Sequence, residues 1–525
     1  MYLVAYRSLL VAFLLIVSSP AFSQIAEDAL LFGQFSPVGT ARFQAIGGAG
    51  FALGGDVSAA ALNPAGIGFF NRSSVAITPN LDINNITTNY ENVSTDVSNT
   101  RLNIANFGLV INNSKDELIP SDWRGGSFAI TYNQIRSFNV DWRFNPANSE
   151  GSVLDEFVRQ SAGISVNELQ DNIDNDLFIG YPEAAYFNFL INPDASNENY
   201  VASIPADATS IQNGEVTTSG RLSQWNIAYG GNYKDKLYLG VSLGIRGFNY
   251  QQETFYREEV VYTQEYIDFI NSGGFFFPVE GGNVSIDFVN LNILDEFLEI
   301  SGTGINGNFG IIYRPINELT VGLSYQTPTF YNLRSEEFFN LASDVRGIRE
   351  DDDQEDPLNI FIDDPVLGNS FLSEYTLSTP SRTGLGLSYF FEKSGFISLD
   401  AEYVNYPKNR FSTNDGFSQE INENVDAIFT SVINARVGGE FRLKQVRFRA
   451  GYAFYPDPTQ FGSDNLNRDR SVISGGIGYD TSSFFADLSV SNTQFETDFA
   501  PYLNGPFIPQ SISRTQALLT LGFKF

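Results

Sequence analysis

The residue types that carry most enzyme chemistry are missing from this chain. It contains no His and no Cys, and its single Met is the initiator. A Ser–His–Asp or Cys–His catalytic group is therefore excluded, as are His-ligated zinc and His- or Met-ligated haem. We expect no catalytic residue, no metal site and no cofactor, and we interpret the protein as not an enzyme.

Acidic residues outnumber basic ones, and the formal net charge is −30. This balance excludes a nucleic-acid partner, which needs a basic surface. The densest acidic run is Asp351 to Asp356, with Asp363 and Asp364 nearby. It lacks the Gly of an EF-hand loop. A solvated loop and a weak site for calcium, or for cations that bridge to anionic glycolipid, both stay open.

The N-terminus is typical of a secretory signal peptide. One Arg, an apolar run from Leu9 to Val17 and the small-residue site Ala21-Phe22-Ser23 predict cleavage after Ser23. The apolar run is too short for a membrane-spanning helix, which needs about 20 residues. Residues 1–23 are therefore expected to direct export.

The rest of the chain shows the period-two alternation of β-strands. In the last strand Ala517, Leu519, Leu521, Phe523 and Phe525 share one face. Only 18% of residues are charged, while 47 are Phe and 25 are Tyr. Such rows, with aromatic residues for the interfaces, indicate a transmembrane β-barrel, all-β and antiparallel. We expect it to span residues 73–525.

Read in this way, the chain holds fourteen strands. The predicted spans are 73–89, 100–113, 124–145, 220–233, 236–256, 297–313, 319–335, 373–391, 396–412, 431–443, 446–455, 469–480, 483–496 and 512–525.

The connections alternate between short and long. The longest are predicted at about 146–219, 257–296 and 336–372. Outer-membrane barrels have short periplasmic turns and long external loops. We therefore place the chain in the outer membrane of a Gram-negative bacterium, with its long loops outside.

Two external loops carry apolar residues at helical spacing. Ser165 to Glu168 is typical of a capping box in front of a short helix. Residues 262–270 fit a second helix, and Phe275, Phe276 and Phe277 follow it. Three exposed Phe are costly unless they pack or cover a ligand. Helices that pack on each other and an external apolar groove both stay open.

Residues 24–72, before the first strand, are rich in Gly and Ala and contain Asn63-Pro64-Ala65-Gly66. Small residues suit a segment packed inside a crowded lumen. A nucleotide-binding glycine loop is the weaker alternative, because no strand–helix unit surrounds it and no Lys follows.

This segment resembles the NPA segment of the FadL/TodX outer-membrane transport family. Motifs at 302–315, 319–325, 379–389 and 449–453 resemble the same family in the same order. The resemblance implies a fourteen-stranded barrel with an N-terminal hatch in its lumen. It also implies passive transport of long-chain fatty acids or other hydrophobic compounds, captured by external loops and released sideways at a kink in strand three.

Strand three has polar residues within an apolar row. Phe128, Ile130 and Tyr132 are followed on that row by Gln134 and Arg136. A lipid-facing Arg costs up to about 2–4 kcal/mol. Either the strand turns inward there, which makes Gln134 and Arg136 the candidate lateral exit, or both lie near an interface. Arg246 faces the lumen by parity and is a candidate contact for a ligand carboxylate, or it pairs with a lumen acid.

Passive transport is thus the leading hypothesis, with a hydrophobic small molecule and outer-membrane lipid and glycolipid as partners. The alternative is a plugged barrel that docks a protein, as a secretion partner for example. An open general porin fits less well with a hatch, and an outer-membrane hydrolase is disfavoured by the missing His. We expect a monomer, and a protein partner stays open.

Overall fold

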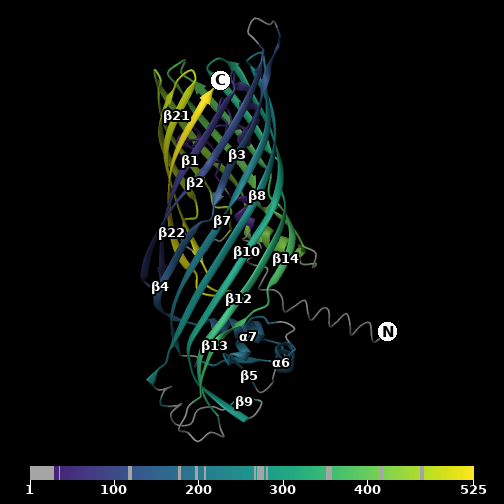
Figure 1. The fold of residues 1–525 in the computed structure, drawn as a ribbon, viewed down its shortest axis with the longest axis vertical. Helices are drawn as coiled ribbons and strands as arrows, with labels where there is room; N and C mark the ends of the chain where they lie inside the picture. Colours follow the sequence, from purple (N-terminus) through teal and green to yellow (C-terminus); the bar gives the residue numbers. More distant parts are fainter. Residues whose placement is uncertain are drawn as a thin grey trace, which may run out of the picture.

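The computed structural model describes residues 29–525 apart from 35, 116–120, 176–178, 195–198, 206–207, 265–267, 269–276, 280–281, 350–357, 414–415, 417 and 461–465. The predicted signal peptide and its cleavage site lie outside these residues. The described chain forms one closed antiparallel barrel, in which β22 pairs with β1 (Figure 1).

The wall has fourteen strand positions, as predicted. In chain order they are β1 (Ser74–Tyr90), β2 (Val93–Ser114), β3 with β4 (Trp123–Ser137 and Val140–Glu150), β7 (Thr209–Tyr233), β8 (Leu237–Val261), β10 (Gly282–Ile316), β11 with β12 (Leu319–Gln326 and Phe330–Arg349), β14 with β15 (Phe371–Ser378 and Arg382–Phe390), β16 with β17 (Gly395–Asn405 and Arg410–Thr413), β18 (Ser431–Leu443), β19 (Val446–Tyr455), β20 (Arg470–Asp480), β21 (Phe484–Phe499) and β22 (Ile508–Lys524).

Several strands run farther than predicted at the end opposite the C-terminus (Figure 1). The loops expected at 257–296 and 336–372 are largely strand: β10 begins at Gly282, β12 continues to Arg349, and β13 (Leu358–Leu367) pairs with it. A short β9 (Phe277–Val279) pairs with the start of β10. The sequence missed these extensions because polar and apolar residues are mixed along them, so apolar alternation no longer marks them.

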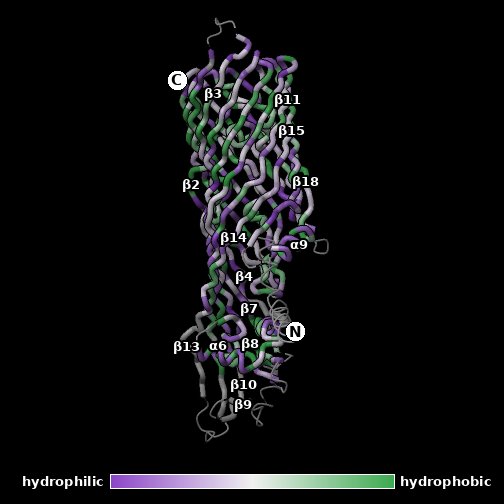
Figure 2. Tube along the Cα trace, turned by 90° about the vertical axis from the view of Figure 1, so that its right-hand side faces the viewer, coloured by the Kyte–Doolittle hydropathy of each residue, from purple (hydrophilic) through white to green (hydrophobic). Residues whose placement is uncertain are grey.

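Apolar and polar rows separate cleanly nearer the C-terminal end. On β8, Leu239, Val241, Leu243 and Ile245 point outward and are 41–52% exposed, whereas inward-facing Arg246 is 2% exposed. The same alternation of hydrophobic and hydrophilic residues is visible along neighbouring strands (Figure 2). We call this outward zone of Leu, Ile, Val and aromatic side chains the apolar belt. Among the described helices, none is long and apolar enough to cross a membrane.

A small folded cap lies between β4 and β7 at the end opposite the C-terminus (Figure 1). It consists of α5 (Val153–Ser161), α6 (Val166–Asp174), α7 (Tyr181–Phe187) and the hairpin β5–β6 (Ile191–Pro193 and Tyr200–Ala202). The helix predicted after Ser165 is confirmed, since the Ser165 side chain accepts a hydrogen bond from the Glu168 backbone N–H. Leu154, Phe157 and Leu169 form its buried core.

The Gly- and Ala-rich segment before β1 lies inside the barrel. It contains α3 (Ala41–Ala45), α4 (Ala59–Leu62) and η1 (Pro64–Phe69), all largely buried. Inward-facing glycines of the wall let it approach closely. A Cβ on Gly322 would lie 2.0 Å from the Phe51 carbonyl oxygen, and one on Gly438 would lie 2.1 Å from that of Ile46. We call residues 36–72 the lumen segment. Two further short elements, η2 (Tyr406–Lys408) and α9 (Ser418–Ile428), flank β17.

Candidate functional site

The barrel wall is interrupted at its third strand. The register of β3 against β7 shifts between Gln134 and Arg136, and β3 ends at Ser137. β4 then continues along β7 but has no ladder to β2. On its side, β2 pairs with β3 only from Asn106 onward, so its residues 93–105 pair with β1 alone in the described wall. The wall therefore has a gap between the first half of β2 and β4.

Local chemistry fixes the interruption. Gly220 on β7 has a φ of +110°, which a residue with a Cβ rarely adopts. Its carbonyl accepts a hydrogen bond from the Phe138 N–H at 3.1 Å, and the Thr218 hydroxyl donates to the Val140 carbonyl at 3.0 Å. These bonds join residues 137–140 to β7, between the end of its ladder with β3 and the start of its ladder with β4, and hold them in an inward step.

Side chains bridge the gap farther along β2. The Asn99 amide donates to the Asp141 carbonyl oxygen at 2.6 Å and accepts from its N–H at 3.2 Å. Arg101 forms an ion pair with the Asp141 carboxylate at 3.5 Å. Such contacts break more readily than a backbone ladder, because exposed ion pairs contribute only about 0–1 kcal/mol.

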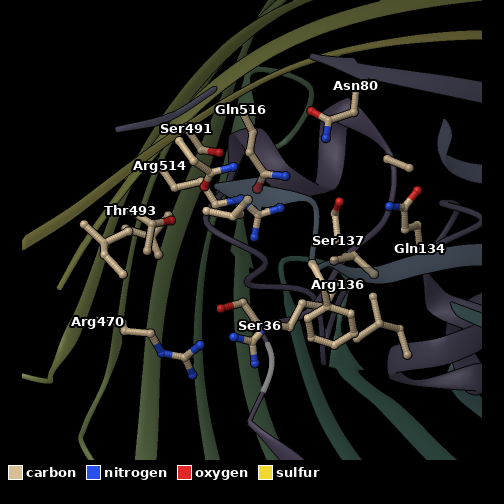
Figure 3. Close-up of a pocket in the computed structure, with 18 of the residues that line it drawn as sticks. Ser36, Asn80, Gln134, Arg136, Ser137, Arg470, Ser491, Thr493, Arg514 and Gln516 are labelled. Atoms are coloured by element: carbon tan, nitrogen blue, oxygen red, sulfur yellow. The ribbon is translucent and has the colours of Figure 1, made fainter. Parts of the chain in front are cut away.

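An internal chamber of about 280 Å³ adjoins the interruption (Figure 3). It is lined by the inward step of β3, the start of β4, the lumen segment and the inner faces of β1, β2, β20, β21 and β22. Its apolar lining includes Ile135, Phe138, Val140, Trp142, Val472 and Ile512, and its polar lining includes Gln134, Arg136, Ser137, Arg470, Ser491, Thr493, Arg514 and Gln516.

The structure brings Gln134 and Arg136 together in this chamber, facing inward. The Arg136 guanidinium lies over the Phe138 ring, 5.1 Å from its centroid. Earlier on the same sequence row, Phe128 is 40% exposed on the outer face. The register shift therefore moves this row from the outside to the inside, and Arg136 faces the interior of the barrel.

Arg246, the residue singled out for a ligand carboxylate, lies elsewhere. It does face the lumen, but it does not line the chamber. Its Nε donates to the Gln224 side chain at 2.6 Å and its Nη1 donates to the Tyr331 hydroxyl at 3.2 Å. With these partners and only 2% exposure, Arg246 joins β8 to β7 and, across the lumen face of β10, to β12.

A second apolar pocket in the lumen is filled by the chain itself. Phe32 is fully buried, and its ring centroid lies 4.2 Å from that of Phe248 and 5.5 Å from that of Tyr331. Phe138, from the inward step, packs on the same Phe248. The N-terminal segment thus contacts the interruption in the wall through aromatic rings.

The Asn63-Pro64-Ala65-Gly66 segment holds the lumen segment in shape. The Asn63 side chain caps η1 by accepting from the Ala65 N–H, and its amide donates to the Phe51 carbonyl oxygen at 2.6 Å. A Cβ on Gly66 would lie 2.9 Å from the Leu53 carbonyl oxygen. These residues pack the segment and lie away from the chamber.

The other sequence candidates fall on residues that the structure leaves out. Phe275 and Phe276 lie outside the described residues, and for Phe277 only the backbone in β9 is described. The acidic run 351–356 is likewise outside. The external groove and the cation site therefore stay predictions.

Two arginines of the chamber were missed by the sequence analysis. Arg514 continues the inward row of Gln516 and Thr520 on the last strand, so parity alone points it to the lumen. Arg470 begins β20 on the row of Val472. Strand parity gives the inward direction of both arginines. It does not show that β20 and β22, which carry them, face the inward step of the third strand.

The cap is attached to the wall through buried carboxylates. Glu258 on β8 accepts hydrogen bonds from the Val153 N–H at 3.0 Å, from the Tyr256 hydroxyl at 2.7 Å and from the Ser152 hydroxyl. Glu296 on β10 accepts from the Tyr181 hydroxyl. Burial raises the pKa of Glu258, and it raises the pKa of Glu296 to about 7.

Solved structures share this fold. A Pseudomonas aeruginosa FadL homologue matches 94% of this chain and 100% of its own, with a TM-score of 0.53 and 12% sequence identity. The toluene transporter TodX of P. putida matches 93% of this chain and 99% of its own, with a TM-score of 0.50 and 12% identity. No protein-family model and no curated protein matches the sequence. The fourteen-stranded antiparallel barrel predicted from the resemblance to the FadL/TodX family is thereby confirmed.

Proposed function

We propose that this protein is an outer-membrane channel through which hydrophobic compounds, long-chain fatty acids among them, pass and leave sideways through the gap between β2 and β4. The observation that carries the proposal is the interruption of the wall beside a chamber. A closed barrel has no unpaired edge, and an unpaired edge in lipid is costly. A gap fixed by Gly220 and Thr218 therefore needs a functional reason.

The surface of the barrel supports its place in a membrane. The apolar belt covers the outward rows of the wall, and polar outward residues such as Glu253 and Arg257 follow it on β8 toward the cap. We place the belt in the hydrocarbon layer, with the cap outside the cell and the C-terminus toward the periplasm.

The lumen segment would then act as the hatch. It crosses the interior and blocks a straight aqueous path, because residues such as Ala41, Ala60 and Ala65 are fully buried against the wall. An apolar solute that enters from the cap side would leave through the gap into the bilayer. The two solved structures with this fold are described as a FadL homologue and a toluene transporter, which agrees with a hydrophobic cargo.

The test closes the gap reversibly. The natural chain has no cysteine. In an Arg101→Cys/Asp141→Cys variant, a short bis-methanethiosulfonate reagent therefore bridges β2 and β4 alone, through two disulfides that a reductant can cleave. We expect uptake of labelled oleate into cells to fall at least fivefold after bridging and to recover with reductant. Each single-cysteine variant, treated in the same way, is the control.

Two outcomes would contradict the proposal. If the bridged channel transported oleate and toluene at the unbridged rate, the gap would not be the exit. If cells without the protein took up both compounds as fast as cells with it, while a secreted protein co-purified in equal amounts, protein docking would replace transport.

A further inference from the structure

The chamber beside the gap is basic within a strongly acidic protein. The whole chain carries 61 Asp and Glu against 31 Lys and Arg, yet the chamber is lined by Arg136, Arg470 and Arg514 and by no acidic residue. Figure 3 shows the three side chains entering it from different parts of the wall. A hydrocarbon cargo gives no reason for this charge.

Only one of the three arginines is neutralised by the protein. The Arg514 Nε donates to the Asp82 carboxylate at 2.8 Å. Among the described residues, Arg136 and Arg470 form no ion pair; Arg136 lies over the Phe138 ring and Arg470 over the Tyr455 ring. The Arg470 Nε is buried without a hydrogen-bond acceptor. A buried cation of this kind is costly unless an anion pairs with it.

Uncharged polar groups surround these two arginines. Ser491 lies opposite Gln516, and Thr493 opposite Arg514, in the ladder of β21 with β22. Gln134 projects from the inward step across the chamber (Figure 3). No described protein group is hydrogen-bonded to the side chains of Ser491, Thr493, Gln134 or Gln516, and all four line the chamber. A carboxamide both donates and accepts, so these groups suit a ligand that does the same.

Apolar residues complete the chamber on the side of the gap. Ile135, Phe138, Val140 and Trp142 come from the inward step and the start of β4. The volume of about 280 Å³ lies just below the range of small-molecule pockets, roughly 300–1,000 Å³. It has room for a head group and its first carbons, and a long chain would have to continue into the gap.

We infer that the chamber selects amphiphiles whose head group combines an anion with an amide, of the N-acyl amino acid class. The carboxylate pairs with Arg136 and Arg470, and the amide exchanges hydrogen bonds with Gln134 and Gln516. The acyl chain follows the apolar side toward the gap. This inference rests on the proposed function, because it names the cargo that leaves by the same gap.

Binding to the purified full-length protein in an uncharged detergent tests the inference. Isothermal titration compares N-oleoylglycine, oleate, the neutral N-oleoylethanolamine and the chain-free N-acetylglycine. We expect N-oleoylglycine to bind at least tenfold more tightly than N-oleoylethanolamine and several-fold more tightly than oleate. Arg136→Gln and Arg470→Gln should each reduce the preference over N-oleoylethanolamine at least fivefold. Gln134→Leu should reduce the preference over oleate.

The chain supplies a control variant for the affinities and a tryptophan that reports where the ligand binds. Arg143 lies on β4, exposed on the outer face, and Arg143→Gln should leave every affinity unchanged. A Trp123→Phe/Trp225→Phe background leaves Trp142 as the single Trp. Its emission should be quenched by N-oleoylglycine whose double bond has been brominated, and competing N-oleoylglycine should restore it.

Three results would overturn the inference. They are equal affinities for N-oleoylglycine, oleate and N-oleoylethanolamine, binding of N-acetylglycine as tight as that of N-oleoylglycine, and Trp142 emission that the brominated ligand does not quench. Oleate uptake through the gap with no preference for N-oleoylglycine would overturn the head-group selectivity alone and leave the proposed function standing. Selective binding of N-oleoylglycine without any uptake through the gap would overturn the proposed function and leave the head-group selectivity standing.

Discussion

The Tyr181 hydroxyl of the cap donates a hydrogen bond to the Glu296 carboxylate of the barrel wall. Tyr181 also stacks on Phe339 of β12, with 4.1 Å between ring centroids. Glu337 on β12 is the other titratable group near this carboxylate, and burial raises its pKa as well. One cap residue thus joins the parts of β10 and β12 that lie beyond the apolar belt, at the end of the barrel opposite the C-terminus.

Docking of the cap should weaken as the pH rises. Burial raises the pKa of Glu296 from 4.5 to about 7 in the docked state, so the docked state binds the proton more tightly. The stabilisation is complete below pH 4.5, declines between pH 4.5 and 7, and is lost above pH 7. Since one pKa unit equals a tenfold change in equilibrium, we expect hydrogen-exchange protection of α7 amides to fall at least tenfold from pH 4.5 to 8.

Glu296→Gln supplies the matched control for this pH dependence. Its carboxamide still accepts from Tyr181 but does not titrate, so most of the fall in protection should disappear. Glu337→Gln should remove a smaller part. If α7 protection in the Glu296→Gln protein still fell as steeply as in the natural protein, the pH dependence of cap docking would not come from this carboxyl group.

Phe32 should determine whether the N-terminal segment stays seated. Its ring fills the pocket against Phe248 and Tyr331, and Phe→Ala in a core costs about 3–5 kcal/mol. We expect Phe32→Ala to release residues 29–34, which limited proteolysis would detect as a shortened N-terminus, while the barrel stays folded. Phe32→Leu, which refills most of the pocket, should stay protected. Equal cleavage of both variants would contradict the seating role.

Some of this site was predictable from single strands and some was not. Two polar residues within the apolar row of strand three gave Gln134 and Arg136, because a lipid-facing Arg is costly. Parity likewise gave the inward direction of Arg246, but not its partners Gln224 on β7 and Tyr331 on β12. Arg470 and Arg514 reach the chamber only because the barrel closes between β22 and β1 and the register of β3 shifts. The break in the apolar row of strand three signals the second event, but the pairing that closes the barrel leaves no periodic signal in the sequence.

The extended strand ends escaped prediction for a related reason. Alternation marks a strand only when its faces meet different solvents. Beyond the apolar belt, β10 and β12 have water on one face and the cap on the other, so polar and apolar residues such as Glu296, Phe297 and Phe338 mix on both rows.

Asp400 should anchor the lumen segment. Its carboxylate accepts from the Gly50 and Phe51 N–H groups at 2.7 and 3.0 Å, and the Arg436 guanidinium lies over the Phe51 ring at 4.8 Å. Hydrogen bonds to a charged group contribute about 1.5–3 kcal/mol each. Asp400→Ala should therefore loosen the segment and raise single-channel conductance in planar bilayers severalfold. Glu392→Ala, in an exposed turn, should conduct like the natural protein. Unchanged conductance of Asp400→Ala would show that other contacts suffice to hold the segment.

Gly451 should be required for the lumen segment to fit. It lies opposite Gly438 in the ladder of β18 with β19, directly under Ile46 and Gly47. A Cβ at Gly451 would lie 2.2 Å from the Gly47 nitrogen, closer than any real contact allows, and both neighbours are backbone. We expect Gly451→Val to form a barrel, seen as the fast-migrating folded band of an unheated gel sample, but with raised conductance because residues 46–47 are displaced. Gly475→Ala is the matched control, since its Cβ would meet only an ordinary contact at 3.6 Å. If Gly451→Val conducted no more than Gly475→Ala, the lumen segment would not depend on this close approach to the wall.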